Sequence, residues 1–343
     1  MRHLLNTLFV TSEDIYLSLD GENVVANREK KVMARYPLHT LSAILSFSYP
    51  GASPALMGAC AQRGISMAFC TPQGKFLARI TGEANGNVLL RRTQYRIADD
   101  PKQSCVIARA MVFGKVHNAR WSIERTRRDH GLRVDGRRLQ EVSGQLKAML
   151  PQLLCQVDLD SLRGQEGAAA TAYFDVFEQF ILADRSVFHF QTRSRRPPLD
   201  PVNALLSFAY SLLAHDCAWA LESVGLDSYV GFLHRDRPGR SSLALDLMEE
   251  LRPCIADRFV LTCINNRIFQ SSDFILRENG GVFLNEDGRR TFLKRWQERK
   301  KESLTHPFLG EKVSWGLIPY LQALLLARYL RGDIDAYPPF LWK

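Results

Sequence analysis

Three separate segments carry side chains that suit metal-assisted chemistry on a phosphodiester, and the first segment surrounds Glu166. This glutamate lies in the run 162–170, which is rich in glycine and alanine. Small residues let a helix pack closely against its neighbours, and a glutamate in such a crowded interior needs a partner or a metal ion because an unpaired buried charge is costly. The alternative is an ordinary carboxylate near the start of a helix, where the helix dipole favours negative charge.

The second segment ends in a histidine. His234 follows the apolar stretch 230–233 and precedes the polar stretch 235–240. Histidines at such a junction are more often structural, but an imidazole there can also bind a metal ion or act as a general base.

The third segment is an expected helix over residues 242–251, which a proline two residues later ends. Asp246 and Glu249 are three residues apart and share one face, and Glu250 is four residues from Asp246 and can share it too. Two carboxylates beside an apolar stripe repel each other unless a cation lies between them. The alternative is a salt bridge from Asp246 or Glu250 to an arginine such as Arg252.

Together, these donors predict a divalent metal site. Carboxylate oxygens favour Mg²⁺ or Mn²⁺, and a single imidazole favours Mn²⁺ somewhat more. Such an ion polarises a phosphoryl oxygen, lowers the pKa of an attacking hydroxyl or water, and neutralises the charge of the transition state. Residue types alone do not show that the three segments meet in space.

Basic clusters indicate a polyanionic partner. The chain carries 45 Lys and Arg residues against 36 Asp and Glu, which gives a net charge of +9, and the basic residues concentrate at 120–138, 193–196 and 289–301. Arginine prevails in the first two clusters, which fits bidentate phosphate contacts, although a single cluster is often just a solvated helix face. The candidate phosphate-binding side chains are Arg125, Arg128, Arg195, Arg196, Arg237, Arg240 and Arg295.

The elements that must position these residues fall into two parts. Residues 1–84 are expected to form a small β-rich domain, with hairpins at Asp20-Gly21 and 71–74. A junction at 85–96 precedes a larger all-α domain over 97–343, so the predicted fold class is α+β. The helix candidates cover residues 54–63, 88–129, 139–154, 166–183, 202–224, 242–251, 289–301 and 315–331.

The composition argues against several classes of protein. Seven cysteines without a C-x-x-C pair argue against a zinc knuckle and against a disulfide framework. The first residues lack the pattern of a secretory signal, and we expect no segment to approach the ~18 apolar residues of a membrane span. We therefore expect a soluble protein of the reducing cytoplasm, with no membrane partner.

The three segments, in this order, resemble blocks of the CRISPR-associated integrase family. The helical domain of that family carries a glutamate in an L-x-G-x-E-G run, a histidine after a G-F-[LI] step, and an acidic pair on the following helix. The corresponding positions here are Glu166, His234, Asp246 and Glu249. Residues 194–207, which include Asn203, are similar to a further family block, and residues 86–95 resemble the family's junction between domains. The Arg-Pro-Gly-Arg run at 237–240 is most similar to the subtype I-C branch.

The resemblance implies a chemistry, a cofactor and partners. Glu166, His234 and Glu249 would hold Mg²⁺ or Mn²⁺, with Asp246 as a support or as a carboxylate for a second metal. The metal would activate the 3′-hydroxyl of a short foreign DNA, which attacks a phosphodiester at the edge of a CRISPR repeat. Asn203 would orient a ligand or a phosphate of the DNA. The implied partners are double-stranded DNA with 3′ overhangs, CRISPR repeat DNA, a second copy of the chain paired through the β-rich domains, and a small ferredoxin-like adaptation protein that completes a heterohexamer.

Two alternative functions remain open at this point. A metal-dependent nuclease that cuts branched or single-stranded DNA would use the same metal site, with water in place of the 3′-hydroxyl. A non-catalytic nucleic-acid scaffold would use the acidic residues only to neutralise buried arginines.

Overall fold

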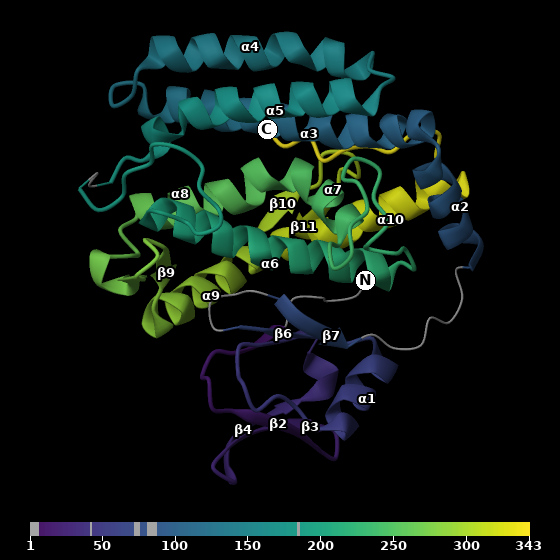
Figure 1. Cartoon of the computed structure of the whole chain (residues 1–343), viewed down its shortest axis with the longest axis vertical. Coiled ribbons are helices and arrows are strands. Elements are labelled where there is room, and N and C mark those ends of the chain that lie inside the picture. The colour runs from purple at the N-terminus through teal and green to yellow at the C-terminus, as the bar shows by residue number, and fades with distance from the viewer. Residues whose placement is uncertain (1–6, 42, 72–75, 81–87, 184–185) are drawn as a thin grey trace.

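The computed structural model describes residues 7–41, 43–71, 76–80, 88–183 and 186–343. A small strand-rich N-terminal lobe lies beneath a larger and mostly helical C-terminal lobe (Figure 1). The predicted α+β fold, with a small β-rich part followed by a larger helical part, is confirmed.

The described residues of the N-terminal lobe form two sheets and one α-helix. Its elements are β1 (Thr7–Val10), β2 (Tyr16–Asp20), β3 (Asn23–Arg28), β4 (Lys31–Pro37), β5 (Ala43–Ser46), α1 (Pro54–Arg63), β6 (Ser66–Cys70) and β7 (Phe76–Ile80). A mixed four-stranded sheet has the order β1-β5-β6-β7, and an antiparallel three-stranded sheet has the order β2-β3-β4. A separate apolar core that includes Leu17, Ile44 and Leu56 joins the two sheets to the helix.

Local signals explain the elements of this lobe. The hairpin predicted at Asp20-Gly21 forms between β2 and β3, and Gly21 takes the positive φ of +56° that this turn needs. Helix α1 has the predicted bounds because the Ser53 side chain accepts a hydrogen bond from the Leu56 N–H and Gly64 ends the helix at a φ of +67°. The turn predicted at 71–74 falls almost wholly outside the described residues, but β6 and β7 on its two sides pair antiparallel.

The C-terminal lobe is mostly helical. Its helices are α2 (Val88–Asp99), α3 (Pro101–His130), α4 (Gly136–Leu154), α5 (Leu159–Asp175), α6 (Pro201–Ser223), α7 (Ser242–Leu251), α8 (Arg258–Asn265), α9 (Glu286–Lys301) and α10 (Ile318–Arg331). A short hairpin of β8 (Phe274–Leu276) and β9 (Val282–Leu284) lies between α8 and α9 in the chain. A second hairpin, of β10 (Ser303–Thr305) and β11 (Lys312–Ser314), lies between α9 and α10.

Several helix boundaries differ from the sequence prediction: α4 begins at Gly136 instead of residue 139, α5 ends at Asp175 instead of residue 183, α9 begins at Glu286 instead of residue 289, and α10 begins at Ile318 instead of residue 315. Three other differences change how the chain runs around the site. The helix expected over 88–129 is divided, because the Asp100 side chain accepts hydrogen bonds from two backbone N–H groups and starts α3. Helix α5 begins at Leu159 instead of residue 166, so Glu166 lies inside the helix and not in its first turn. The chain also does not leave the helix at Pro253. It continues through a π-helical segment, Arg252–Asp257, into α8, because wider turns accommodate a residue without an N–H.

Two further expectations need correction. Residues 88–96 of the expected junction belong to α2, which packs against α3 and α10 of the helical lobe. The expected all-α domain also contains the two hairpins β8-β9 and β10-β11. Each of their strands has three residues, which is too short for an alternating pattern to be recognised in the sequence.

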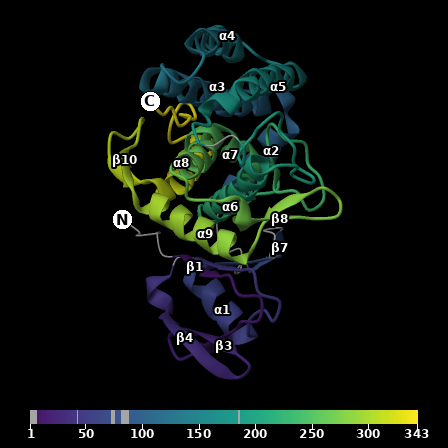
Figure 2. The same cartoon turned by 90° about the vertical axis from the view of Figure 1, so that its left-hand side faces the viewer.

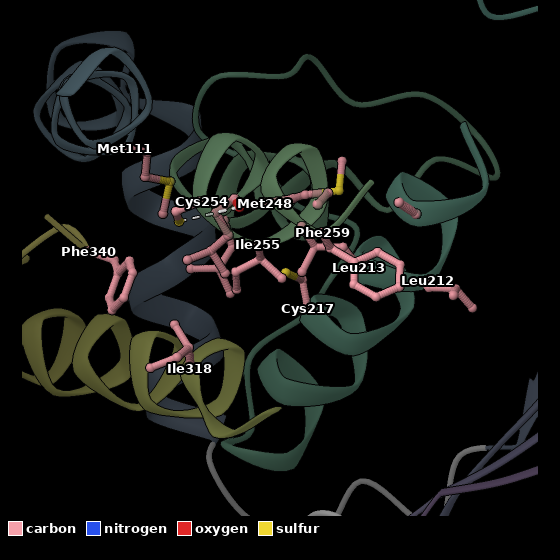
Figure 3. Close-up of a cluster of buried hydrophobic side chains, with 14 of the residues drawn as sticks. Met111, Leu212, Leu213, Cys217, Met248, Cys254, Ile255, Phe259, Ile318 and Phe340 are labelled. Atoms are coloured by element: carbon pink, nitrogen blue, oxygen red, sulfur yellow. Dashed lines mark hydrogen bonds between the residues drawn. The ribbon is translucent and has the colours of Figure 1, made fainter. Parts of the chain in front are cut away.

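The packing of the helices fixes the position of α7. Helix α3 packs against α4, α5 and α7, whereas α6 packs against α7 and α10. In the view turned by 90°, α3, α4 and α5 lie on the side away from the N-terminal lobe, and α6 and α9 lie toward it (Figure 2). Met111, Cys217, Met248 and Ile255 lie together in the apolar cluster beside α7 (Figure 3). This core holds one side of α7 in place.

Helix α6 differs in one respect from the sequence expectation. By length and composition it is the one helix of the described residues that could cross a membrane, with a mean hydropathy of 1.3 over its most apolar window. However, 61% of that window is buried inside the protein, as in a core helix.

Candidate active site

The candidate active site lies where α3, α5 and α7 meet. Helix α3 packs against both of the other helices and contributes Lys115, α5 contributes Glu166, and α7 contributes Glu249. His234 comes from the loop between α6 and α7. The structure therefore brings Glu166, His234 and Glu249 into one region, with the Lys115 side chain between the two glutamates.

Glu249 is a buried acidic side chain with basic groups on several sides. Its side chain is 3% exposed. Its Oε2 lies 2.6 Å from Lys115 Nζ, and its Oε1 lies 3.0 Å from an Arg252 guanidinium nitrogen and 3.9 Å from His234 Nε2. Burial alone would raise the pKa of Glu249, but the charges of Arg252, Lys115 and His234 outweigh burial and lower it to about 2. The Glu249 carboxylate is therefore ionised over the whole physiological range.

Asp246 holds the histidine loop. Its Oδ2 accepts hydrogen bonds from the N–H groups of Phe232 (2.6 Å) and Leu233 (2.9 Å). Its Oδ1 accepts from the His234 N–H (3.0 Å) and lies 2.6 Å from His234 Nδ1. An imidazole that carries its proton on Nδ1 keeps a lone pair on Nε2, which is the nitrogen that faces Glu249.

The close approach of this loop to α7 depends on a glycine. A Cβ atom at Gly231 would come 2.8 Å from Asp246 Oδ2 and 2.9 Å from Ser242 Cβ. Only glycine leaves room for these contacts, so the G-F-L step before His234 is a packing requirement as well as a sequence motif.

Glu250 points away from the site. Its carboxylate accepts hydrogen bonds from Gln322 Nε2 (2.9 Å), Tyr337 Oη (2.5 Å) and the Phe340 N–H (2.9 Å), and thereby holds the C-terminal segment. Burial raises the pKa of Glu250 to about 7. Glu250 therefore does not share a face with the metal-ligand candidates, and neither it nor Asp246 forms the salt bridge considered for Arg252, which pairs with Glu249 instead.

The site opens into a cleft lined by basic side chains. A cleft of about 680 Å³ is lined by Lys115, Glu166, Arg193 and Arg252 among others. It continues into a hollow of about 910 Å³ that reaches the N-terminal lobe. Arg195 and Arg196 line both spaces, and Arg79, Arg240 and Arg289 line the second. A polyanion could follow this surface from the gap between the lobes to the carboxylates.

The predicted phosphate-binding arginines do not form one surface. Arg195, Arg196 and Arg240 line the cleft or the hollow. Arg237 is exposed on the loop before α7. The remaining three are engaged on other helices: Arg125 stacks at 4.0 Å over the Trp342 ring, Arg128 pairs with Asp129, and Arg295 pairs with Glu298.

Asn203 has a structural position. It is fully buried, and its Oδ1 accepts hydrogen bonds from an Arg193 guanidinium nitrogen (2.7 Å) and from the Ser194 N–H (3.1 Å). Its Nδ2 donates to the Thr192 carbonyl at 2.8 Å. With its amide used in this way, Asn203 shapes the segment that carries the cleft arginines, and its role toward a ligand or a phosphate stays a prediction.

The donor set fits a divalent cation after one change. In the part of the chain that the structure describes, no three His, Cys, Asp or Glu side chains stand close enough to share an ion as they are. The point between Glu166 and Glu249 is taken by the Lys115 ammonium. Glu249 Oε2 is buried, and apart from the Lys115 ammonium it has no polar partner among the described groups, so it is free to bind a cation that replaces the ammonium. The residues therefore fit a metal ion once the ammonium has moved.

Two residues of this region could not be predicted from the sequence. Lys115 lies in a long helix without a motif around it, and nothing in the sequence places it opposite residues more than fifty positions away. Tyr210 was also missed. Its hydroxyl donates to Asp257 at 2.6 Å, and the guanidinium groups of Arg193 and Arg252 lie 5.2 and 5.3 Å from its ring centre.

Comparisons with known proteins indicate one family for this chain. The sequence model of the family described as CRISPR associated protein Cas1 matches residues 8–298. A curated relative from Chlorobaculum tepidum, named CRISPR-associated endonuclease Cas1 1, is 49% identical over 343 residues, which is 100% of each chain.

Two solved structures share the fold. A casposase bound to integration product has a TM-score of 0.84 at 22% identity, over 98% of this chain and 94% of that chain. A Cas6-RT-Cas1–Cas2 complex has a TM-score of 0.81 at 22% identity, over 100% of this chain and 36% of that chain. With a family match over most of its length and a full-length relative at 49% identity, this chain belongs to the CRISPR associated protein Cas1 family.

Proposed function

We propose that this protein joins the 3′-hydroxyl of a short foreign DNA to the edge of a CRISPR repeat by metal-dependent transesterification. The observation that carries the proposal is a pair of glutamates, Glu166 and Glu249, bridged by a cation at one end of an arginine-lined cleft. A phosphodiester bound in that cleft would lie against the carboxylates. The name of the Chlorobaculum tepidum relative supports a DNA-cleaving or DNA-joining enzyme, and the fold shared with a casposase bound to integration product is consistent with joining.

The proposed cofactor is Mg²⁺ or Mn²⁺, held by Glu166, His234 and Glu249. When bound, such an ion polarises the phosphoryl oxygen and lowers the pKa of the attacking hydroxyl. Asp246 acts as a positioning residue, because four N–H donors already use its carboxylate and leave little capacity for a second metal.

The chain supplies the rest of the site through charge and shape. Arg252 lies against Glu249 and lines the cleft, so it can also meet a phosphate. Arg195, Arg196 and Arg240 would bind the DNA backbone through charge-assisted hydrogen bonds. Such contacts carry no sequence information, so DNA binding should be tolerant of sequence and sensitive to salt.

Two other functions are outcomes of the same test. A metal-dependent nuclease acting on branched or single-stranded DNA is favoured by the word endonuclease in the names of the relatives, and it would use the same centre with water as the nucleophile. In a non-catalytic scaffold, the ion pairs of Glu249 with Lys115 and Arg252 would persist, and no metal would replace them.

The proposed assembly is a homodimer that joins a small ferredoxin-like partner in a heterohexamer. The edge strand β4 exposes Val32, Met33 and Tyr36 beside unpaired backbone groups, which supports pairing between N-terminal lobes. The similarity to a chain of a Cas6-RT-Cas1–Cas2 complex supports a Cas2-like partner. The run Arg237–Arg240 supports a subtype I-C-like system. We also propose that the protein acts in the cytoplasm, on double-stranded DNA with 3′ overhangs and on CRISPR repeat DNA.

A strand-transfer assay tests the proposal. The protein, with and without its small partner, is given a short labelled duplex with 3′ overhangs, a supercoiled plasmid carrying a repeat, and Mn²⁺ or Mg²⁺. Transfer of the label to the plasmid by the wild type, and its loss in the Glu166→Ala variant, would support the integrase. Nicked plasmid without transferred label supports the nuclease, and DNA binding with neither product, in the presence of the partner, supports the scaffold.

A further inference from the structure

We infer that Lys115 is a built-in counter-ion of the metal centre, which holds the place of the metal in the metal-free protein and makes tight metal binding depend on a bound phosphate. The inference rests on the metal site of the proposed function. It concerns a residue that neither the sequence motifs nor the family resemblance indicates.

The position of the Lys115 side chain carries the inference. Its Nζ contacts Glu166 and lies 2.6 Å from Glu249 Oε2, so one ammonium bridges the two carboxylates that a metal would also need. The Lys115 side chain is 12% exposed. It therefore fills the centre from within and is not a surface lysine that happens to reach it.

The two glutamates and the two basic side chains paired with them balance in charge without a metal. Glu166 and Glu249 bring two negative charges, and Lys115 and Arg252 bring two positive charges. A divalent ion that binds the same carboxylates must displace the ammonium, since both cations need the same oxygens. In addition, the two positive charges of the ion would then lie close to Lys115 and Arg252, and like charges in a partly buried site repel strongly.

The cleft gives the displaced ammonium a place to go. Lys115 lines the cleft of about 680 Å³ together with Arg193 and Arg252. A lysine side chain has a flexible four-carbon stem, so its ammonium group can swing from the glutamates into this cleft. An anion in this cleft, such as a DNA phosphate, would neutralise the excess positive charge and attract the free ammonium. Metal and phosphate should therefore bind cooperatively, and each should tighten the other by the same factor.

The test measures Mn²⁺ binding by the full-length protein directly, from the electron paramagnetic resonance signal of free Mn²⁺. In the wild type, Mn²⁺ should bind weakly alone and more tightly when a short single-stranded oligonucleotide is present. Lys115→Met removes the charge but keeps an unbranched side chain of similar length, so its Kd for Mn²⁺ without DNA should fall by roughly tenfold or more. The gain from added oligonucleotide should shrink by a similar factor. Lys115→Arg, which keeps the charge, should behave like the wild type.

The matched control is Lys147→Met, which removes the same charge from an exposed position on α4 and should leave both Kd values unchanged. Equal Mn²⁺ affinity in the wild type and in Lys115→Met, or weaker affinity in the variant, would overturn the inference while leaving the metal site intact. If no variant binds Mn²⁺ with or without oligonucleotide, the metal site of the proposed function itself fails. If Lys115→Met does not fold, Lys115→Gln removes the same charge with a polar side chain and decides the question.

Discussion

The substitution Asp246→Asn separates the support of the histidine loop from direct participation in the site. Asp246 accepts four hydrogen bonds, from the backbone N–H groups of Phe232, Leu233 and His234 and from the imidazole of His234. Asparagine has one acceptor oxygen and one NH₂ group in nearly the same shape. The NH₂ group must therefore face two of the four former donors.

The two orientations of the new amide have different consequences. If the NH₂ group faces Phe232 and Leu233, two buried N–H groups lose their acceptor, at a cost of about 1–3 kcal/mol each. The total of about 2–6 kcal/mol is a large part of a typical stability of about 5–15 kcal/mol. If the NH₂ group faces His234, the ring must accept at Nδ1 and carry its proton on Nε2, so the nitrogen that faces Glu249 loses its lone pair.

Two measurements on the same protein distinguish these outcomes. Chemical denaturation gives the free energy of unfolding. The affinity for Mn²⁺ shows whether His234 Nε2 still has a free lone pair. We expect Asp246→Asn to lose stability, metal affinity or both, and strand transfer to fall with metal affinity. Asp236→Asn, on the exposed loop after His234, is the matched control and should change neither quantity by much. Unchanged stability together with unchanged metal affinity in Asp246→Asn would refute this role of Asp246.

Three further predictions follow from the packing and charges of the helical lobe. Gly114→Ala should destabilise the protein by about 1–3 kcal/mol in a denaturation curve, because the new Cβ would lie 2.8 Å from Glu250 Cβ; unchanged stability would show that α3 and α7 can separate. Burial raises the pKa of Asp257 from an ordinary 3.8 to about 6, so the folded protein binds this proton more tightly than the unfolded chain does. The resulting stabilisation of about 3 kcal/mol is fully present below pH ~4 and is lost as the pH rises through ~6. Asp257→Asn should flatten the dependence of unfolding free energy on pH in this window, and an unchanged slope would contradict the burial argument. Replacing both Arg195 and Arg196 by alanine should weaken DNA binding for all sequences and reduce the salt slope of log K by roughly two, as measured by fluorescence anisotropy; a sequence-dependent loss would contradict backbone binding.

The sequence predicted best where a local signal decides the structure. The cap and the closing glycine of α1, the hairpin at Gly21 and the spacing of Asp246 and Glu249 on α7 all depend on neighbouring residues, and each is present in the structure. The order of the segments around Glu166 and His234 also indicated the family.

The sequence predicted least where distant segments decide the structure. Asp246, Glu249 and Glu250 look alike on a helical wheel, but only the packing of the loop 231–234 on one side and of the C-terminal segment on the other gives each a different partner. The role of Lys115 could not be predicted from the sequence for the same reason, because it depends on two other helices that contact this side chain in the folded protein.

Helix ends were also hard to predict when a polar residue or a proline had two possible roles. Asp100 starts a helix inside a pattern that reads as continuous, and Pro253 is accommodated in a widened turn instead of ending the helix.

The most direct test of the metal centre is a crystal of the protein soaked in Mn²⁺ and measured at a wavelength where manganese scatters anomalously. We expect one strong anomalous peak between Glu166, His234 and Glu249, with the Lys115 ammonium no longer bridging the two glutamates. The peak should be absent from crystals of Glu249→Gln. A peak at another position, or no peak at a Mn²⁺ concentration that supports strand transfer in solution, would contradict a metal centre formed by these three residues.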